Sequence, residues 1–306
     1  MNKMRFALVG AGRWGKVYIQ TISRLANIEI TALCTSNPKN KDLVSTNCHI
    51  CSQWDEIFTL KNIDGLILAV PPSIQFDILL KNSNYKIPVI LEKPLTINAK
   101  QSEELTILYS NKEIISLIDH IYLFHPAYMA LKENLHLIGP IKNIVTEGGS
   151  CGPFREHTSP LWDYGPHDLS MCLDITGEYP TKIKSKLISS KKNKKTSKEI
   201  WEVNLQFPNG IHTKSTLGNG MKKKIRTIEV IGENGSLIFD NFEKEKLRIK
   251  KNSKFTTISI PDINKLPLDI AIETFANAIR GKDDYRLGLT LGSNIVRILE
   301  KCDLNN

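Results

Sequence analysis

One short stretch, WDYGPHD (residues 162–168), places a carboxylate and an imidazole four positions apart, at Asp163 and His167. Gly165 and Pro166 lie between them, and because proline suits the first turn of a helix, we expect a helix to begin near Pro166. An imidazole with an unperturbed pKa near ~6.5 accepts a proton at neutral pH, and a carboxylate can orient it or a substrate hydroxyl. Taken singly, a helix-capping aspartate and a core histidine are the ordinary explanations of these residues.

A second stretch, ALVGAGRWGK, has a G-x-G-x-x-G frame directly after an apolar run. The residues of its turn are Gly10, Gly12, Arg13, Trp14 and Gly15. Gly10 allows a tight turn, Gly12 lets backbone N–H groups approach a pyrophosphate, and Gly15 lets a helix pack closely on a strand. The frame alone also fits glycines that merely shape a turn. Its position between a strand and a helix, at residues 16–26, favours dinucleotide binding with the diphosphate at the helix N-terminus.

Polar or proline residues follow three further apolar runs, at residues 28–34, 65–70 and 88–91. Ligands of open parallel sheets bind at the carboxyl ends of the strands, so these residues are candidates for contacts with the cofactor. They are Thr35, Ser36, Pro71, Pro72, Glu92 and Lys93. The Lys93 ammonium could in addition stabilise a developing alkoxide, which makes it a candidate catalytic residue together with Asp163 and His167. A surface lysine is the ordinary alternative.

These residues need a scaffold, and the first part of the chain alternates apolar strands with amphipathic helices. This pattern predicts a parallel sheet covered on both faces, the doubly wound α/β class, to about residue 120. Beyond it we expect a helix at 126–138, the helix near Pro166, two closing helices, and seven strands with one polar and one apolar face. The strands are expected at 181–190, 199–207, 211–218, 225–232, 236–240, 246–251 and 255–260.

Alternating strands joined by Pro-Asn-Gly and Glu-Asn-Gly turns predict a large antiparallel sheet with one open face. The second domain is therefore α+β. The predicted domains are 1–120 for NAD(P) and 121–306 for the substrate, with the active site in the cleft between them. An uncovered sheet face favours a homo-oligomer.

The formal charge of +9 is spread thinly over 306 residues, with dense clusters only at 191–195 and 222–224. Lysines without interleaved aromatics favour a solvated hairpin tip over a nucleic-acid surface. We expect a small-molecule partner and neither nucleic acid nor membrane, because no apolar run approaches ~20 residues. The N-terminus does not resemble a signal peptide, so a cytoplasmic location is expected.

Six cysteines are too few for a disulfide scaffold of this size; they are Cys34, Cys48, Cys51, Cys151, Cys172 and Cys302. Cys48-His49-Ile50-Cys51 contains zinc-ligand types, but the chain has no second C-x-x-C pair. Reduced, half-buried thiols are therefore favoured, and no metal is predicted.

The order GAGRWG, AVPP, EKP (92–94) and WDYGPHD resembles the glucose–fructose oxidoreductase and inositol dehydrogenase family, often called Gfo/Idh/MocA. DHIYLFHPA (119–127), which is similar to a GHxxxFHPA pattern, and IGENGSLIFD (231–240) extend the resemblance over nearly the whole chain. It implies a pyridine-nucleotide oxidoreductase acting on a sugar, polyol or sugar nucleotide. Lys93 matches the active-site lysine, and Asp163 and His167 match the substrate-side pair.

The stretch around WDYGPHD looks most like the branch that oxidises UDP-N-acetylhexosamines or their uronic acids at C3, for surface polysaccharide or lipid A. Another sugar or polyol dehydrogenase, inositol-like, and a dinucleotide-binding sensor without turnover are the alternatives.

The chain departs from the family pattern at two places. Gln75 stands where many relatives have the histidine of PPxxH. No carboxylate ends the second strand; Thr35, Ser36 and Asn37 stand there, with Lys39 and Lys41 close behind. The loss of a charge that repels a 2′-phosphate leaves NAD or NADP open as the cofactor.

Overall fold

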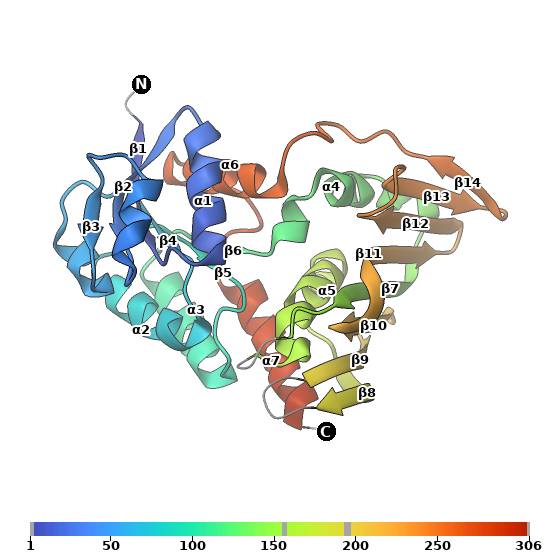
Figure 1. Ribbon diagram of the computed structural model, residues 1–306. Coiled ribbons are helices and arrows are strands. Elements are labelled where there is room, and N and C mark those ends of the chain that lie inside the picture. Colours follow the sequence, from blue (N-terminus) through green and yellow to red (C-terminus); the bar gives the residue numbers. More distant parts are fainter. Residues whose placement is uncertain (1–2, 155–157, 193–196, 305–306) are drawn as a thin grey trace. The chain divides into compact units, whose positions relative to one another are not determined.

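The computed structural model describes residues 3–154, 158–192 and 197–304 and divides into two compact units (Figure 1). The first unit holds Met1–Asp119 and Leu268–Val296, and the second holds His120–Pro267 and Arg297–Asn306. The division at 119/120 lies next to the boundary that the sequence suggests. Residues 268–296, which the sequence analysis assigns to the second domain, group with the first unit instead.

The first unit is built on a six-stranded parallel sheet of order β3-β2-β1-β4-β5-β6. The strands are β1 (Met4–Val9), β2 (Ile28–Cys34), β3 (His49–Cys51), β4 (Gly65–Leu68), β5 (Val89–Glu92) and β6 (Ser116–Asp119). β4, β5 and β6 are buried along their whole length, which explains why they read as continuous apolar runs. The predicted doubly wound class is confirmed; the short β3 was not predicted.

Helices cover the sheet of the first unit. They are α1 (Arg13–Arg24), α2 (Pro72–Asn82), α3 (Ala99–Asn111), α6 (Pro267–Ile279) and the first part of α7 (Thr290–Leu304), with 3₁₀ turns at Pro38–Leu43 and Trp54–Thr59. Phe275 of α6 packs on Phe6 of β1, with ring centroids 5.6 Å apart. Ser293 of α7 lies 3.1 Å from Ser102 of α3 through their hydroxyl oxygens. These contacts explain why the C-terminal stretch belongs to this unit.

The second unit is built on an eight-stranded sheet of order β14-β13-β12-β11-β7-β10-β9-β8. Its strands are β7 (Ile141–Cys151), β8 (Lys182–Lys192), β9 (Ser197–Gln206), β10 (His212–Gly218), β11 (Gly220–Gly232), β12 (Gly235–Asp240), β13 (Leu247–Lys251) and β14 (Lys254–Thr257). All neighbours are antiparallel except β7 and β10. The mainly antiparallel sheet is confirmed, but β7, which lies in its middle, was not predicted.

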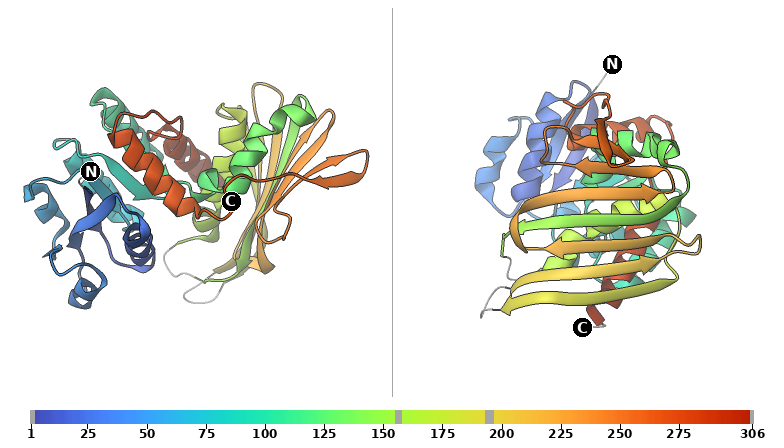
Figure 2. Two further views of the ribbon diagram at one scale, coloured as in Figure 1. Left: turned by 90° about the horizontal axis from the view of Figure 1, so that it is seen from above. Right: turned by 90° about the vertical axis from the view of Figure 1, so that its right-hand side faces the viewer.

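Helices lie on one face of this sheet, and among the described residues no helix covers the other face (Figure 2). They are α4 (Pro126–Glu133), α5 (Pro160–Thr176) and the last part of α7, with 3₁₀ turns at Ile121–Phe124 and Leu135–Ile138. The predicted helix at 126–138 is therefore two pieces, because α4 ends at Glu133.

The predicted helix start near Pro166 is wrong, because α5 begins at Pro160. Ser159 is the N-cap: its hydroxyl accepts a hydrogen bond from the backbone N–H of Trp162 at 3.4 Å, and Pro160 takes the first helical position. Pro166 lies inside the helix. A side chain at Gly165 would come within 2.6 Å of Leu299 of α7, so the glycine before Pro166 allows close packing.

The lysine-rich tip between β8 and β9 lies largely outside the described residues, which omit 193–196. None of the helices in the described part of the chain is long and apolar enough to cross a membrane.

Candidate active site

The glycine turn of the first unit lies between β1 and α1, as the sequence predicts. Gly10 has φ of +93°, and a side chain on it would lie 2.4 Å from the carbonyl oxygen of Ala69. A side chain on Gly15 would lie 2.0 Å from the carbonyl oxygen of Gly10. Gly12, by contrast, is exposed, and a side chain there would meet nothing within 4 Å. Gly10 and Gly15 are therefore required by the fold, and the open space at Gly12 fits the close approach of a diphosphate.

The first turn of α1 is suited to an anion. Gly12 is the N-cap, and no acidic residue occupies the first turn. Arg13 and Trp14 follow it and are exposed, Trp14 at 37%. The backbone N–H groups of a helix N-terminus, the helix dipole and the Arg13 guanidinium all favour negative charge at this end of α1. These residues fit the diphosphate of a dinucleotide.

The loop after β2 separates the roles of Thr35 and Ser36. The Thr35 hydroxyl accepts hydrogen bonds from the Asn40 side-chain amide at 3.0 Å and from the backbone N–H of Asn37 at 3.2 Å. Thr35 is only 9% exposed, whereas Ser36 and Lys39 are exposed. Thr35 therefore shapes the loop, and Ser36 is the better placed of the two for a ribose or a 2′-phosphate.

We expect Ser36→Asp to weaken binding of NADP about tenfold more than binding of NAD, because the new carboxylate would repel a 2′-phosphate. Fluorescence titrations of both reduced cofactors measure the ratio. Ser36→Asn introduces a side chain of nearly the same size as aspartate but without its charge. It should leave the ratio of the NADP and NAD affinities nearly unchanged. Equal losses for both cofactors in Ser36→Asp would show that this loop does not contact the 2′ position.

Gln75 stabilises the segment that carries Glu92 and Lys93. It follows Pro71 and Pro72 on α2 and is fully buried. Its side-chain amide donates to the backbone carbonyl oxygens of Glu92, Pro94 and Leu95, at 3.0 to 3.1 Å. The residue that replaces the family histidine thus holds the backbone around Lys93, a role that the sequence did not reveal.

Asp163 and His167 lie on one face of α5 in the second unit, since residues four apart in a helix are neighbours. Both are half-buried. The His167 and Tyr122 rings make an edge-to-face contact. Their planes lie at 87° to each other and their centroids are 5.3 Å apart. The structure thus brings two of the three candidate catalytic residues together, while Lys93 lies at the end of β5 in the first unit.

A buried ion pair contacts the other partner of this aromatic pair, the Tyr122 ring. The Arg226 guanidinium lies 4.8 Å from the centroid of the Tyr122 ring and forms a salt bridge with Asp168, the residue after His167. Arg226 and Asp168 are both nearly inaccessible. Burial raises the pKa of Asp168, and Arg226 opposes this shift. The sequence analysis did not predict this ion pair. The signal that could have revealed it is Arg226, a charged residue inside the apolar pattern of β11.

The cysteines of the stretch 48–51 lie beside β2. Cys51 pairs in register with Cys34, and both are buried, as is Cys48. Burial raises the pKa of Cys34 to about 12 and that of Cys48 to about 11, which favours neutral thiols. In the described part of the chain, no group of three potential ligands is placed to hold a metal ion.

Two family models match this architecture. The NAD-binding Rossmann-fold model of the GFO/IDH/MocA oxidoreductase family matches residues 4–120, and the C-terminal domain model of the same family matches residues 153–238. The chain belongs to the GFO/IDH/MocA family. It is therefore an oxidoreductase whose first domain binds NAD or NADP.

Relatives and solved structures agree with this family. A crystal structure of an oxidoreductase from Magnetospirillum magnetotacticum MS-1 is 32% identical, with a TM-score of 0.91 over 98% of this chain and 100% of that chain. The UDP-N-acetylglucosamine 3-dehydrogenase of Acidithiobacillus ferrooxidans is 20% identical over 91% of this chain and 90% of its own length. The inositol 2-dehydrogenase of Rhizobium meliloti is 21% identical over 90% and 86%.

Proposed function

We propose that this chain is an NAD(P)-dependent dehydrogenase that transfers hydride between a sugar or nucleotide-sugar hydroxyl and the nicotinamide. Our first candidate substrate is a UDP-N-acetylhexosamine oxidised at C3, for surface polysaccharide or lipid A. The similarity to the UDP-N-acetylglucosamine 3-dehydrogenase over nearly the full length of both chains supports this candidate.

The observation that carries the proposal is the pairing of Asp163 with His167 on one half-buried face of α5. An alcohol becomes a ketone when its carbon loses a hydride and its oxygen loses a proton. The imidazole of His167 takes the hydroxyl proton, and Asp163 orients either the imidazole or a neighbouring sugar hydroxyl. The Tyr122 ring restricts the rotation of the imidazole.

Lys93 contributes charge in this scheme. Its ammonium stabilises the negative charge that develops on the substrate oxygen as the proton leaves. The Gly10–Gly15 turn, Arg13 and Ser36 hold the cofactor, which supplies the hydride acceptor when it is bound. Pro71, Pro72 and Glu92, which follow or end neighbouring strands, complete the candidate cofactor contacts.

An inositol-like polyol is the second candidate substrate. The inositol 2-dehydrogenase of Rhizobium meliloti supports it, because its identity and coverage equal those of the nucleotide-sugar enzyme within a few per cent. Such a substrate has no diphosphate, so the two candidates differ in charge. A sensor without turnover is the third alternative.

Native mass spectrometry of the purified chain, followed by turnover assays at 340 nm, tests the proposal. We expect NAD or NADP as an adduct, and substrate-dependent reduction of the cofactor with a UDP-N-acetylhexosamine. Reduction with inositol alone would favour the second candidate. Cofactor binding without turnover of any sugar, nucleotide sugar or polyol would contradict the proposed activity and leave the sensor.

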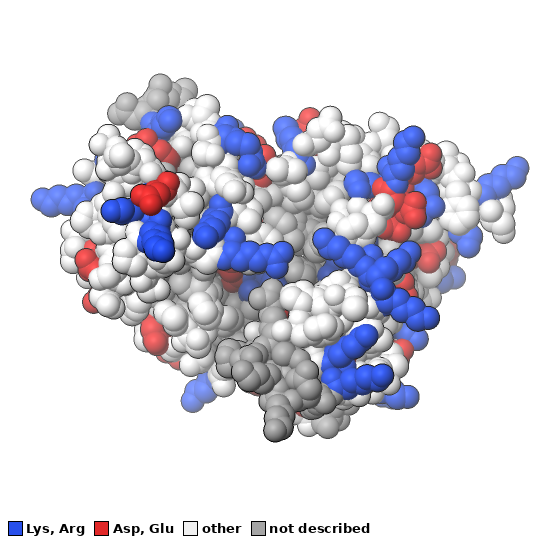
Figure 3. Space-filling view, viewed as in Figure 1, with Lys and Arg blue, Asp and Glu red and all other residues white. Residues whose placement is uncertain are grey.

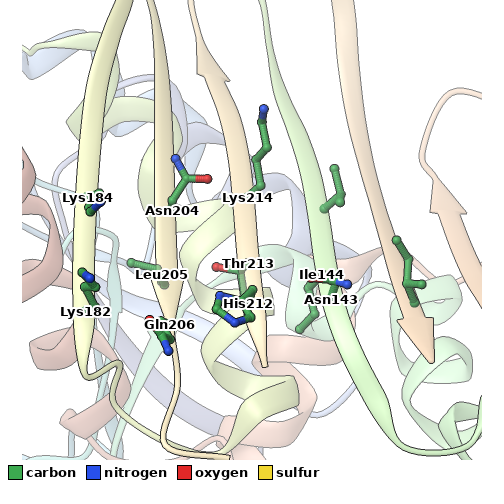
Figure 4. Close-up of a pocket in the computed structure, with 12 residues that line it drawn as sticks. Asn143, Ile144, Lys182, Lys184, Asn204, Leu205, Gln206, His212, Thr213 and Lys214 are labelled. Atoms are coloured by element: carbon green, nitrogen blue, oxygen red, sulfur yellow. The ribbon is translucent and has the colours of Figure 1, made fainter. Parts of the chain in front are cut away.

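The same measurement reports the oligomeric state, for which we propose self-association through the uncovered face of the large sheet. Lys182 and Lys184 of β8 lie on this face and line a hollow of about 430 Å³ (Figure 4). Glu147 of β7 and Glu229 of β11 lie farther across it. A twofold axis would place this face of one copy against the same face of another.

We propose a cytoplasmic enzyme with small-molecule substrates and without a nucleic-acid partner. On the face shown in Figure 3, lysine and arginine side chains lie on both units and gather most densely on the second, with acidic side chains around that group. Lysines without interleaved aromatic residues are nevertheless not typical of a nucleic-acid surface. The distribution supports small anionic ligands.

A further inference from the structure

The first part of β11 carries a lysine cluster that none of the roles above uses. In the pairing of β11 with β7, Gly220 faces Cys151 and Ile225 faces Gly149, so five steps along β11 correspond to two along β7. The extra residues form a bulge in the ladder. We call residues 221–224 the basic bulge, because they include three exposed lysines: Lys222, Lys223 and Lys224.

The basic bulge lies one strand away from the part of β7 that contacts α5 beside the candidate catalytic pair. Tyr164 and Asp168 are the residues of α5 that directly follow the two members of this pair. The hydroxyl oxygens of Tyr164 and Ser150 are 2.6 Å apart, and a side chain on Gly148 would lie 2.3 Å from the Asp168 carboxylate. Because neighbouring strands are about 4.8 Å apart, the basic bulge and the catalytic pair share one end of the large sheet.

An exposed aromatic ring lies at the same end. Lys224 is two residues, about 7 Å along the strand, from the buried Arg226 that pairs with Asp168. The Lys224 ammonium lies 5.2 Å from the centroid of the Phe242 ring, which is 46% exposed. The backbone N–H of Asn241 donates to the carbonyl oxygen of Arg226 at 3.0 Å, which fixes the loop after β12 beside β11.

The acidic residues of this loop do not cancel the charge of the basic bulge. The loop holds Glu243, Lys244, Glu245 and Lys246, whose formal charges sum to zero. The densest group of lysine and arginine side chains in the space-filling view lies in the region where the ribbon diagram draws β11 (Figures 1 and 3). Three lysines beside an exposed ring match the parts of a nucleotide, because ammonium groups bind phosphate oxygens and aromatic rings stack on bases.

We propose that the basic bulge and Phe242 form the subsite for the nucleoside diphosphate of a nucleotide-sugar substrate. The inference rests on the proposed function, because it requires the sugar hydroxyl to lie at His167. In a nucleotide sugar the diphosphate is attached at C1 of the same ring that carries C3, so both groups reach the same end of the sheet. An inositol-like polyol has neither phosphate nor base and makes no use of this subsite.

Binding of UDP and of inorganic pyrophosphate tests the subsite without turnover. Isothermal titration calorimetry is carried out with saturating NADH, so that the dinucleotide site is already filled. Combined replacement of Lys222, Lys223 and Lys224 by serine should weaken both ligands about 30-fold at low ionic strength, and less at high salt, because salt screens exposed charges. Phe242→Ala should weaken UDP about tenfold through the lost stacking and leave pyrophosphate unchanged.

The β13–β14 hairpin provides a matched control at the opposite end of the sheet. Lys250 pairs with Ser236 at the start of β12 and lies 5.6 Å from the ring of Phe255, which is 55% exposed. Lys251 and Lys254 are exposed beside it. Replacing these three lysines by serine removes the same charge, and Phe255→Ala removes the same ring. Neither change should affect the affinity for UDP.

The outcomes separate this proposal from the proposed activity. A wild-type chain that does not bind UDP, or equal losses in the bulge and hairpin variants, would overturn the subsite. Turnover of a UDP-sugar with a KM that the bulge substitutions leave unchanged would also overturn it and would keep the dehydrogenase. Binding of UDP that only the bulge and Phe242 variants lose, without turnover of any UDP-sugar, would support the subsite and contradict the activity.

Discussion

Lys93→Met and His167→Asn are each expected to lower the rate of hydride transfer by roughly 10²-fold or more, the scale of losing an acid–base group. Lys93→Met removes the charge that stabilises the developing alkoxide, and His167→Asn removes the proton acceptor. The affinity for the dinucleotide should change little, because the Gly10–Gly15 turn holds the phosphates. Single-turnover kinetics at 340 nm and cofactor titrations measure the two quantities separately.

The pH dependence distinguishes the two residues. With His167 as base, alcohol oxidation should rise with pH as the imidazole becomes neutral, and His167→Asn should lose this rise. A rise that persists in His167→Asn would assign the ionisation to another group.

Exposed residues of the same types provide controls. Lys100→Met at the start of α3 and His136→Asn after α4 should leave turnover unchanged. If Lys93→Met and His167→Asn turn over normally with a verified substrate, the catalytic assignment is wrong although the family is right. If they fail to bind dinucleotide, these residues stabilise the fold and their catalytic roles must be withdrawn.

The parts of the fold that follow from local sequence were predictable. The Gly10–Gly15 turn and the buried strands are set by spacing and apolar runs. The predicted helix start near Pro166 was wrong because Pro160 also suits the first helical position. The capping serine, Ser159, lies before Pro160, so the helix begins there. Pro166 then lies inside the helix, next to Gly165, which packs closely on Leu299. β7 was not predicted from the sequence because its glycines, Gly148 and Gly149, weaken a strand pattern.

Those glycines are explained only by distant residues. A side chain at Gly148 would lie 2.2 Å from Arg226 and 2.3 Å from Asp168. The glycine therefore makes room for the ion pair of these two residues, which contacts the Tyr122 ring. The return of residues 268–296 to the first unit likewise depends on contacts such as Phe6 with Phe275. Tertiary contacts of this kind leave no periodic signal, and for the same reason the sequence did not reveal Tyr122.

Gly15→Ala and Gly12→Ala are expected to have opposite consequences, although both change the same turn. At Gly15 the new methyl group would lie 2.0 Å from the backbone carbonyl oxygen of Gly10, so the helix and the turn must separate. Overpacking of this kind costs about 3 kcal/mol, and a domain of this size then loses on the order of 10 °C in Tm. Differential scanning fluorimetry without cofactor measures the loss.

Gly12→Ala should leave the fold intact and impair the site. Gly12 has φ of −70° and ψ of −158°, which alanine adopts without strain, and its methyl group would meet no protein atom within 4 Å. The Tm should therefore change little. The methyl group would instead occupy the space where a diphosphate approaches the backbone, so we expect the affinity for NAD(P)H to fall roughly 100-fold, equivalent to about 2.7 kcal/mol.

The comparison of the two variants separates a turn that the fold requires from a turn that the ligand requires. Isothermal titration of each folded variant with NADH and NADPH provides the decisive numbers. Gly12→Ala that binds both cofactors like the wild-type chain would show that the diphosphate does not approach the first turn of α1 at this residue. A large loss of Tm in Gly12→Ala would show that Gly12 also supports the fold, contrary to the open space around it.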